Sequence, residues 1–394
     1  MKSVKKAPAD LSFLDEREHF IPIRAAILLD RLTAGRNAAE ARHLQALWER
    51  LANRFHFDYR QICAPLRDIY APLDPDRDTL CEPTLCADER SAAAQEVFGG
   101  IVTLLERCNF RSLSRDQLNE CLRLQPMGGL AVRVDTEEFS AFEVRYRGVR
   151  DTQIPWPKWQ IWRRDKTRPT KILKKVFVLA RQKEEAGGRL ILKLFKDVPV
   201  ENLKIIAPKI TLGLPIFDRL KIGSTVAGGL VTSAAKLVMA AAFSWWLFFL
   251  FLFGFILALV KGVFGFLHSR TKYMQICASS LYYQSLSNNV GAVSSLAAMA
   301  EDQEVKETLL AYEILRRNEG LFLTERQLDA AVEKWLVEEF TELRDVDFES
   351  NDAVRKVVEK RLAEVKNSPD AHPTYRAFDL ETALDHLRQD WASR

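Results

Sequence analysis

The sequence predicts a membrane protein of mixed α+β class, with an N-terminal lobe of helices and a β-hairpin, a two-helix transmembrane hairpin and an all-helical C-terminal lobe. Three observations lead to this prediction. Residues 222–267 form an apolar segment whose only charged side chains are Lys236 and Lys261, in a chain that is 28% charged. A surplus of basic side chains precedes this segment. The parts on either side carry the apolar periodicities of helices and strands.

The apolar segment has the length of two membrane helices. A helix crosses a bilayer core of about 30 Å with roughly 20 residues, so we expect spans at about 222–241 and 247–267. A turn between them would place Trp245 and Trp246 at the membrane interface, where tryptophan is enriched. One tilted span over residues 237–260 is the alternative.

The two lysines and the small residues of the segment fit two spans. The long stems of Lys236 and Lys261 allow their ammonium groups to reach the two membrane surfaces as interface anchors. Small residues recur every four positions on both predicted spans, and this spacing lets membrane helices approach closely. The predicted packing positions are Ser224, Gly228 and Thr232 on the first span and Gly254, Ala258 and Gly262 on the second.

The apolar segment divides the chain into four predicted parts. Residues 152–221 carry 17 basic and 6 acidic groups, whereas residues 268–394 carry 16 and 23. Because basic residues near membrane spans remain in the cytoplasm, we expect both termini there. The parts are an N-terminal helical and α+β lobe at 1–151, a basic, tryptophan-containing juxtamembrane α+β segment at 152–221, the transmembrane hairpin at 222–267 and an acidic helical lobe at 268–394.

Local patterns predict the elements of the N-terminal lobe. Ser114 and Gln117 have the spacing of a capping box at the start of a helix. The alternating runs 130–135 and 142–148 predict a β-hairpin. A helix followed by a hairpin is the outline of a winged helix, and also of ordinary α+β packing. Apolar residues three and four positions apart predict further helices at 19–32, 39–57 and 96–110.

The juxtamembrane segment combines a predicted hairpin with a basic, aromatic stretch. Residues 175–199 form two apolar runs around Gly187 and Gly188, which predicts a second hairpin. Aromatic rings beside cations suit anionic lipid headgroups. The same residues suit nucleic acid, or a core that contains the tryptophans. The candidates for headgroup binding are Trp156, Trp159, Trp162, Arg163, Arg164, Lys166, Arg168, Lys171, Lys174 and Lys175.

Helical periodicity dominates the C-terminal part. Thr324 and Gln327 form a second capping-box pattern. Tyr282, Tyr283, Asn288 and Asn289 are the most distinctive polar cluster and a candidate binding site; the alternative is that the asparagines end a helix and the tyrosines pack. The expected helices cover 271–289, 292–317, 328–340, 347–365 and 378–391.

Several motifs carry a family resemblance. They are REHFIPIR at 17–24, LKLFKDVPVENLKIIAP at 192–208, LYYQSLSNN at 281–289, AEDQEVKETLLAY at 300–312 and DFESNDAVRKV at 347–357. With these motifs in this order around an apolar pair, the chain resembles a membrane protein family of unknown function that includes mitochondrial transmembrane protein 143. The resemblance implies a membrane-embedded protein but no reaction, ligand or catalytic residue. The first twenty residues lack the features of a presequence, which favours a multi-pass protein of a bacterial inner membrane.

No catalytic motif is present in the sequence, which lacks a Walker A loop, a GxSxG elbow and an HExxH helix. The six histidines lack the close spacing of metal ligands, and the scattered cysteines favour free thiols. We therefore expect no enzymatic activity, no cofactor and no metal site.

The predicted function is that of a membrane-anchored scaffold or regulatory module. Its cytoplasmic lobes would bind anionic lipid headgroups, an unknown protein partner or a second copy of the chain. An oligomeric transporter or channel built from the hairpin is the alternative, and a membrane-tethered nucleic-acid binder is the second.

Overall fold

The computed structural model describes residues 11–14, 17–76, 85–124, 131–134, 138–155, 167–208, 210–213, 281–318, 320–343, 346–368 and 371–392, with scattered helical positions between 246 and 278. The helices are α1 (Ala25–Thr33), α2 (Ala38–Tyr70), α3 (Ala87–Arg107), α4 (Arg115–Arg123), α5 (Leu203–Ile206), α8 (Asn289–Arg317), α9 (Glu325–Glu339), α10 (Ser350–Glu359) and α11 (Leu380–Ala392). The strands are β1 (Arg111–Ser112), β2 (Ala131–Val134), β3 (Phe139–Pro155), β4 (Thr167–Gln182), β5 (Leu190–Pro199), β6 (Ile210–Gly213), β7 (Ser285–Asn288), β8 (Leu323–Thr324), β9 (Ala363–Ser368) and β10 (Ala371–Ala377).

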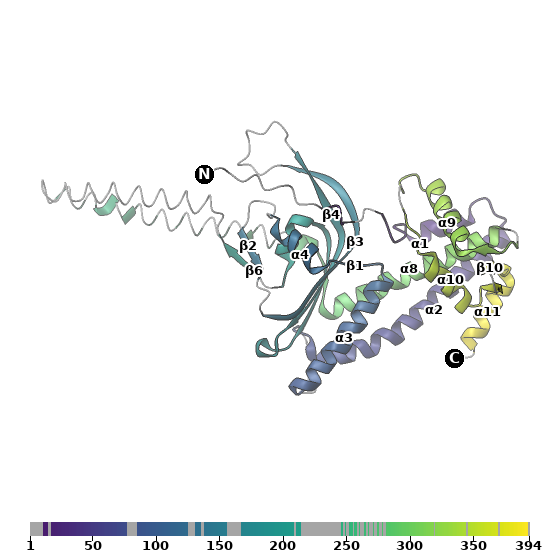
Figure 1. The fold of residues 1–394 in the computed structure, drawn as a ribbon, viewed down its shortest axis with the longest axis horizontal. Coiled ribbons are helices and arrows are strands. Elements are labelled where there is room, and N and C mark those ends of the chain that lie inside the picture. Colours follow the sequence, from purple (N-terminus) through teal and green to yellow (C-terminus); the bar gives the residue numbers. More distant parts are fainter. Residues whose placement is uncertain are drawn as a thin grey trace.

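The central sheet is antiparallel, with the strand order β1-β3-β4-β5-β7 (Figure 1). Strand β4 lies in its middle and contains the apolar run Val176–Ala180, in which no residue is more than 1% exposed. Successive side chains of a strand point to opposite faces of the sheet. Phe177 and Leu179 join one hydrophobic core, and Val176 and Val178 join another. The continuous apolar run thus reflects a strand that is covered on both faces.

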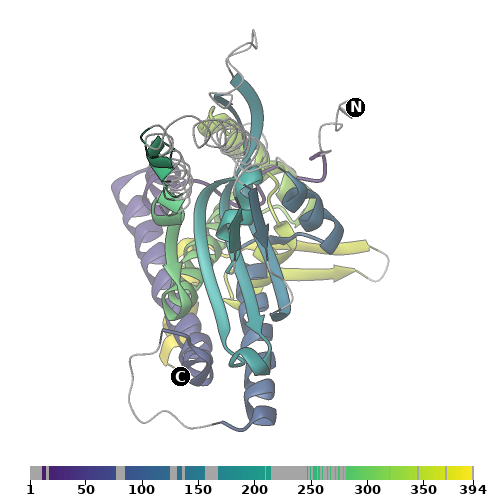
Figure 2. The ribbon, with the colours of Figure 1, turned by 90° about the vertical axis from the view of Figure 1, so that its left-hand side faces the viewer.

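Helices cover the two faces unequally. Long helices α2, α3 and α8 lie on one side of the curved sheet, and short helix α4 lies on the other (Figure 1). The strands run side by side in Figure 2, with α2, in purple, alongside them. Because α2 precedes the sheet in sequence and α8 follows it, the N-terminal and C-terminal parts of the chain share one core.

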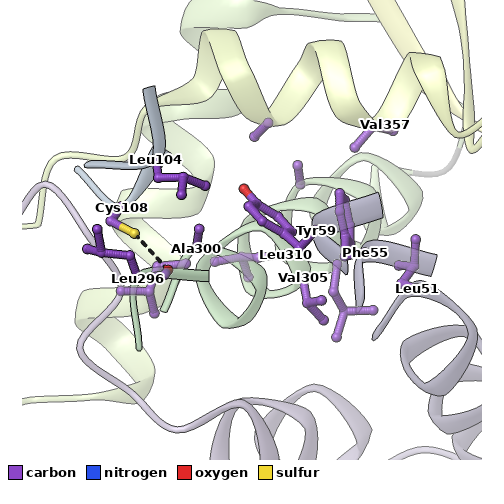
Figure 3. Close-up of a cluster of buried hydrophobic side chains, with 14 of the residues drawn as sticks. Leu51, Phe55, Tyr59, Leu104, Cys108, Leu296, Ala300, Val305, Leu310 and Val357 are labelled. Carbon is purple, nitrogen blue, oxygen red and sulfur yellow. Dashed lines mark hydrogen bonds between the residues drawn. The ribbon is translucent and has the colours of Figure 1, made fainter. Parts of the chain in front are cut away.

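Helix α8 is the centre of the helical layer. Every residue from Gln303 to Leu315 is buried, charged residues included. Figure 3 shows the core around it, to which α2 contributes Tyr59 and α8 contributes Leu310. The thiol of Cys108 donates a hydrogen bond to the carbonyl of Leu296 at 3.2 Å. Burial raises the pKa of this thiol to about 12, so Cys108 stays protonated in the core.

The described helices correct the predicted membrane class. None of them is long and apolar enough to cross a bilayer. A span needs about 20 mostly apolar residues, whereas α2 carries charged side chains along its length and α8 carries them from Glu301 onward. The predictions of a transmembrane hairpin, a multi-pass protein and a bacterial inner-membrane location with cytoplasmic termini are therefore wrong for the residues that the structure describes. Most of segment 222–267 lies outside those residues.

Few of the predicted membrane positions are described. Trp246 and Gly254 are helical, and the side chain of Trp246 is 84% exposed. The other predicted anchors and packing positions lie outside the described residues, namely Ser224, Gly228, Thr232, Lys236, Trp245, Ala258, Lys261 and Gly262.

Three predictions about strands are also corrected. The predicted N-terminal hairpin is wrong, because β2 pairs with β6 and β3 pairs with β1 and β4. The all-helical C-terminal lobe is wrong, because β8, β10 and β9 form a three-stranded sheet there. The helix expected to reach Asn289 gives way at Ser285 to β7, which pairs with β5. In each case the sequence pattern of one segment does not show which other segment its strand pairs with.

Predictions from local signals are confirmed. The hairpin around Gly187 and Gly188 joins β4 to β5, and both glycines have positive φ. Ser114 and Thr324 cap α4 and α9 with the predicted capping boxes. Cysteines 63, 86, 108 and 121, which the structure describes, are free thiols.

Candidate anion-binding site

A cavity of about 640 Å³ lies between the sheet, α8 and the segment that leads into α1. We call this segment, residues 17–24, the N-terminal strap, and we call the cavity the basic pocket. Its lining contains five cationic side chains and one carboxylate. The lining residues are Phe20, Ile21, Pro22, Ile23, Arg24, Ala25, Ala26, Arg147, Lys174, Lys175, Asp302 and Lys306.

Two cations form the floor of the basic pocket. Arg147 on β3 and Lys175 on β4 are direct partners in the antiparallel register. Side chains of such partners lie on the same face of a sheet, about 5 Å apart at Cβ, and like charges there destabilise the sheet. The sheet therefore holds two repelling cations together on the face that the helical layer covers.

The guanidinium group of Arg147 is held in place by a backbone carbonyl and an aromatic ring. Arg147 is 8% exposed, its Nη1 donates to the carbonyl of Cys108 at 3.1 Å, and its Cζ lies 4.0 Å from the ring centroid of Phe20. Its buried Nε has no hydrogen-bond partner in the described part of the chain. Leaving such a donor unpaired costs roughly 1–3 kcal/mol or more.

Lys175 is the less well satisfied of the two cations. Its Nζ lies 2.8 Å from Sδ of Met299, and a thioether is only a weak acceptor. No carboxylate among the described residues forms an ion pair with it. Burial, together with the neighbouring Arg147, lowers the pKa of Lys175.

Lys306 connects α8 to the N-terminal strap. Its Nζ donates to the carbonyls of Ile21 and Ile23 at 2.9 and 3.1 Å and lies 2.8 Å from Oδ2 of Asp302. The side chain is only 4% exposed, and burial lowers its pKa. Lys306 is therefore a positioning residue, which fixes the strap and supplies positive charge to the pocket.

Gly148 lets the strap lie against the sheet. Its φ is +71°, and an added Cβ would lie 2.9 Å from Cδ of Lys174 and 3.2 Å from Cε1 of Phe20. Lys174 itself is paired with Glu18 of the strap. Only glycine combines this backbone conformation with so close an approach.

The first turn of α1 also faces the cavity, through Ala25 and Ala26. The N-cap residue, Arg24, makes no side-chain hydrogen bond to the helix, and the turn contains no acidic residue. The first N–H groups of a helix lack partners within the helix and carry partial positive charge. They add to the positive potential of the pocket.

The predicted headgroup candidates fall into three groups. Lys174 and Lys175 lie in the basic pocket. Lys171 lies on the same strand but outside the lining, 3.6 Å from Asp151. The backbone of Arg168 belongs to β4, and its side chain is not described. The remaining candidates lie outside the described residues, namely Trp156, Trp159, Trp162, Arg163, Arg164 and Lys166.

The predicted polar cluster does not form one site. Tyr282 and Tyr283 are 78% and 72% exposed, and their rings pack edge to face at 5.4 Å. Asn288 is exposed, whereas Asn289 is 5% exposed and accepts a hydrogen bond from the N–H of Leu192 at 3.1 Å. Asn289 therefore joins α8 to the sheet and is not available to a ligand.

Sequence reasoning missed four charged residues of the pocket: Arg24, Arg147, Asp302 and Lys306. Arg147 stands in an alternating strand pattern, where a polar position is expected to face solvent. The identification of this strand face as buried requires knowledge that α8 covers it. The motif REHFIPIR, which is the whole strap, was the available signal.

One family model matches part of the chain. Residues 161–291 are similar to a family described as a protein of unknown function (DUF3754). The matched range contains β4, β5 and β7, and with them Lys174 and Lys175. No solved structure matches the chain. The resemblance to the family of mitochondrial transmembrane protein 143 stays a prediction.

Proposed function

We propose that this protein is a non-enzymatic binding module whose basic pocket holds a phosphate group, either free phosphate or the phosphate of a larger molecule. The observation that carries the proposal is the facing pair of Arg147 and Lys175, two cations without a carboxylate partner in the described chain. An anion between them would turn their repulsion into attraction.

The charges of the pocket favour a compact, highly charged anion. Lys174 is paired with Glu18, and Lys306 with Asp302. Arg24, Arg147 and Lys175 have no such pairing within the described ranges. Arginine supplies a planar fork and lysine a point charge, the two groups that proteins use for phosphate. The start of α1 adds backbone donors of the kind that bind phosphate.

Binding would connect three parts of the chain that are distant in sequence. The strap, the β3–β4 pair and α8 each supply a wall of the pocket. A ligand that binds only the folded state raises the free energy of unfolding, by about 2.7 kcal/mol at a concentration 100 times its Kd. This coupling suits a regulatory module whose folded state becomes more stable when an anion binds.

The test is calorimetric titration of the full-length protein. Inorganic phosphate, glycerol phosphate and vesicles of phosphatidylcholine with or without phosphatidylserine are compared, so that free phosphate and lipid headgroups are distinguished. Lys175→Gln should weaken binding at least about tenfold, which is about 1.4 kcal/mol. Lys171→Gln, on the same strand but outside the pocket, is the matched control and should have no effect. Absence of binding to all these probes, or an equal loss in both variants, contradicts the proposal.

A further inference from the structure

A second cavity, of about 540 Å³, lies between α2 and α11. It shares no lining residue with the basic pocket. We propose that this arginine–aromatic cavity binds a planar aromatic ring that carries a phosphate or carboxylate group. The proposal does not depend on the function proposed above.

The cavity contains both an aromatic and a cationic region. Phe57 of α2 and Trp391 of α11 pack edge to face, with ring centroids 5.6 Å apart and an interplanar angle of 66°. Trp391 is 53% exposed and keeps a large apolar surface available. An aromatic ligand placed against this pair would gain stacking or edge contacts.

Helix α2 supplies the cations from one face. Arg50, Arg54, Phe57 and Arg60 line the cavity and stand three or four positions apart along the helix. Residues at this spacing lie above one another on a helix surface. Arg50 and Arg60 form no ion pair with a carboxylate in the part of the chain that the structure describes, so two guanidinium groups can meet an incoming anion.

Arg54 is the buried member of this row. It is 2% exposed, with Nη2 3.4 Å from Oδ1 of Asp58 and Nε 3.3 Å from Oδ2 of Asp390. None of its three guanidinium nitrogens makes a hydrogen bond of good geometry to a described residue. Asp58 and Asp390 balance the charge of Arg54, so this residue fixes the cavity wall and leaves the anionic end of a ligand to Arg50 and Arg60.

Size and chemistry together define the ligand class. The cavity volume lies in the range of small-molecule sites, which combine apolar walls with a few placed polar groups. Burial lowers the pKa of Arg50, and a bound anion would offset that cost. A ring against Trp391 and an anionic group at Arg50 and Arg60 satisfy both regions of the cavity.

The test is calorimetric titration with 1-naphthyl phosphate, with inorganic phosphate and 1-naphthol as comparison ligands. The full-length Lys175→Gln variant is used, because phosphate could otherwise occupy the basic pocket. 1-Naphthyl phosphate should bind at least about tenfold more tightly than either comparison ligand, because each of them lacks one of the two features that the cavity recognises.

Substitutions then locate the site. Trp391→Ala should weaken binding of 1-naphthyl phosphate by about fivefold or more, the low end for the loss of one stacked ring, and Trp391→Phe should restore most of it. Arg50→Gln should weaken binding about tenfold. Arg42→Gln, two turns earlier on α2 and outside the lining, should change nothing. No binding, equal affinity for all three ligands, or binding that survives both Trp391→Ala and Arg50→Gln would overturn the proposal.

Discussion

Helix α8 contributes to two buried clusters of charge that are built in opposite ways. In the basic pocket, Lys175 faces Arg147 and has a thioether as its hydrogen-bond acceptor. In the second cluster, which we call the α8–α10 charge cluster, Lys356 lies 2.6 Å from Asp352, 3.0 Å from Glu307 and 3.7 Å from Glu304. One lysine lacks a carboxylate partner in the described chain, and the other has three.

The pKa values of the two lysines move in opposite directions. Burial lowers the pKa of Lys175, and Arg147 lowers it further. Burial would also lower the pKa of Lys356, but Glu307, Glu304 and Asp352 outweigh it and raise the value. The difference teaches that burial of a lysine does not by itself indicate a structural role. A paired lysine stabilises the fold, whereas an unpaired one leaves room for a ligand.

The largest expected effect comes from breaking the α8–α10 charge cluster. Lys356→Met leaves buried Glu307 without its cation and Glu304 with only Arg107, 3.9 Å away, and removal of one partner from such a cluster costs about 3–5 kcal/mol. Urea denaturation of the full-length protein should show this loss in the free energy of unfolding. A change below about 1 kcal/mol, the level of a surface ion pair, would mean that the cluster is not structural.

The next effect concerns the strap that closes the basic pocket. Gly148→Ala forces an L side chain into positive φ and against Phe20, which should lower the free energy of unfolding by about 1–3 kcal/mol. It should also weaken phosphate binding, because the strap is displaced. Gly35→Ala has a similar φ of +74° with no heavy atom within 4 Å, and serves as the control for backbone strain alone. Equal behaviour of both variants in phosphate titrations would show that the strap does not shape the pocket.

A smaller and opposite effect is expected for the unpaired lysine. Lys175→Met removes a cation that faces Arg147, so the free energy of unfolding should rise by up to about 1 kcal/mol in the absence of an anion. The same variant should lose phosphate affinity. Denaturation and titration of one preparation measure both quantities. A loss of stability instead would indicate that Lys175 has a stabilising partner.

The smallest effect lies in the pH dependence. The pKa of Lys175 is lowered in the folded state, so its charged form destabilises the fold. This destabilisation disappears as the pH rises toward 10.5, the ordinary lysine value. Because the pKa of Lys356 is raised, its contribution is present below 10.5 and is lost above it. Differences between wild type and each Met variant, measured by denaturation across alkaline pH, should therefore have opposite slopes. Parallel slopes would remove the distinction between the lysines.

Local sequence signals predicted much of the fold. The capping boxes at Ser114 and Thr324 and the hairpin at Gly187 depend on residues within a few positions of one another. The pairing of β2 with β6 joins residues near 132 to residues near 212, and no pattern within either strand identifies its partner. The apolar segment was assigned to the membrane from its length, composition and residue spacing, and the described helices do not support that assignment.

The candidate site was predicted only in part for the same reason. Lys174 and Lys175 were identified because basic residues gather in one stretch of sequence. Arg147 and Lys306 join them only through the sheet register and the packing of α8. The sequence could therefore indicate a basic stretch but not the pocket, whose walls come from three separate regions.

The most direct test is the melting temperature of wild type and Lys175→Met, measured with and without saturating phosphate at constant ionic strength. Without phosphate, Lys175→Met should melt at the higher temperature, because the repulsion from Arg147 is absent. With phosphate, wild type should become the more stable protein, because only it binds the anion tightly. A melting order that phosphate does not reverse would contradict the claim that the unpaired cations of the basic pocket exist to bind an anion.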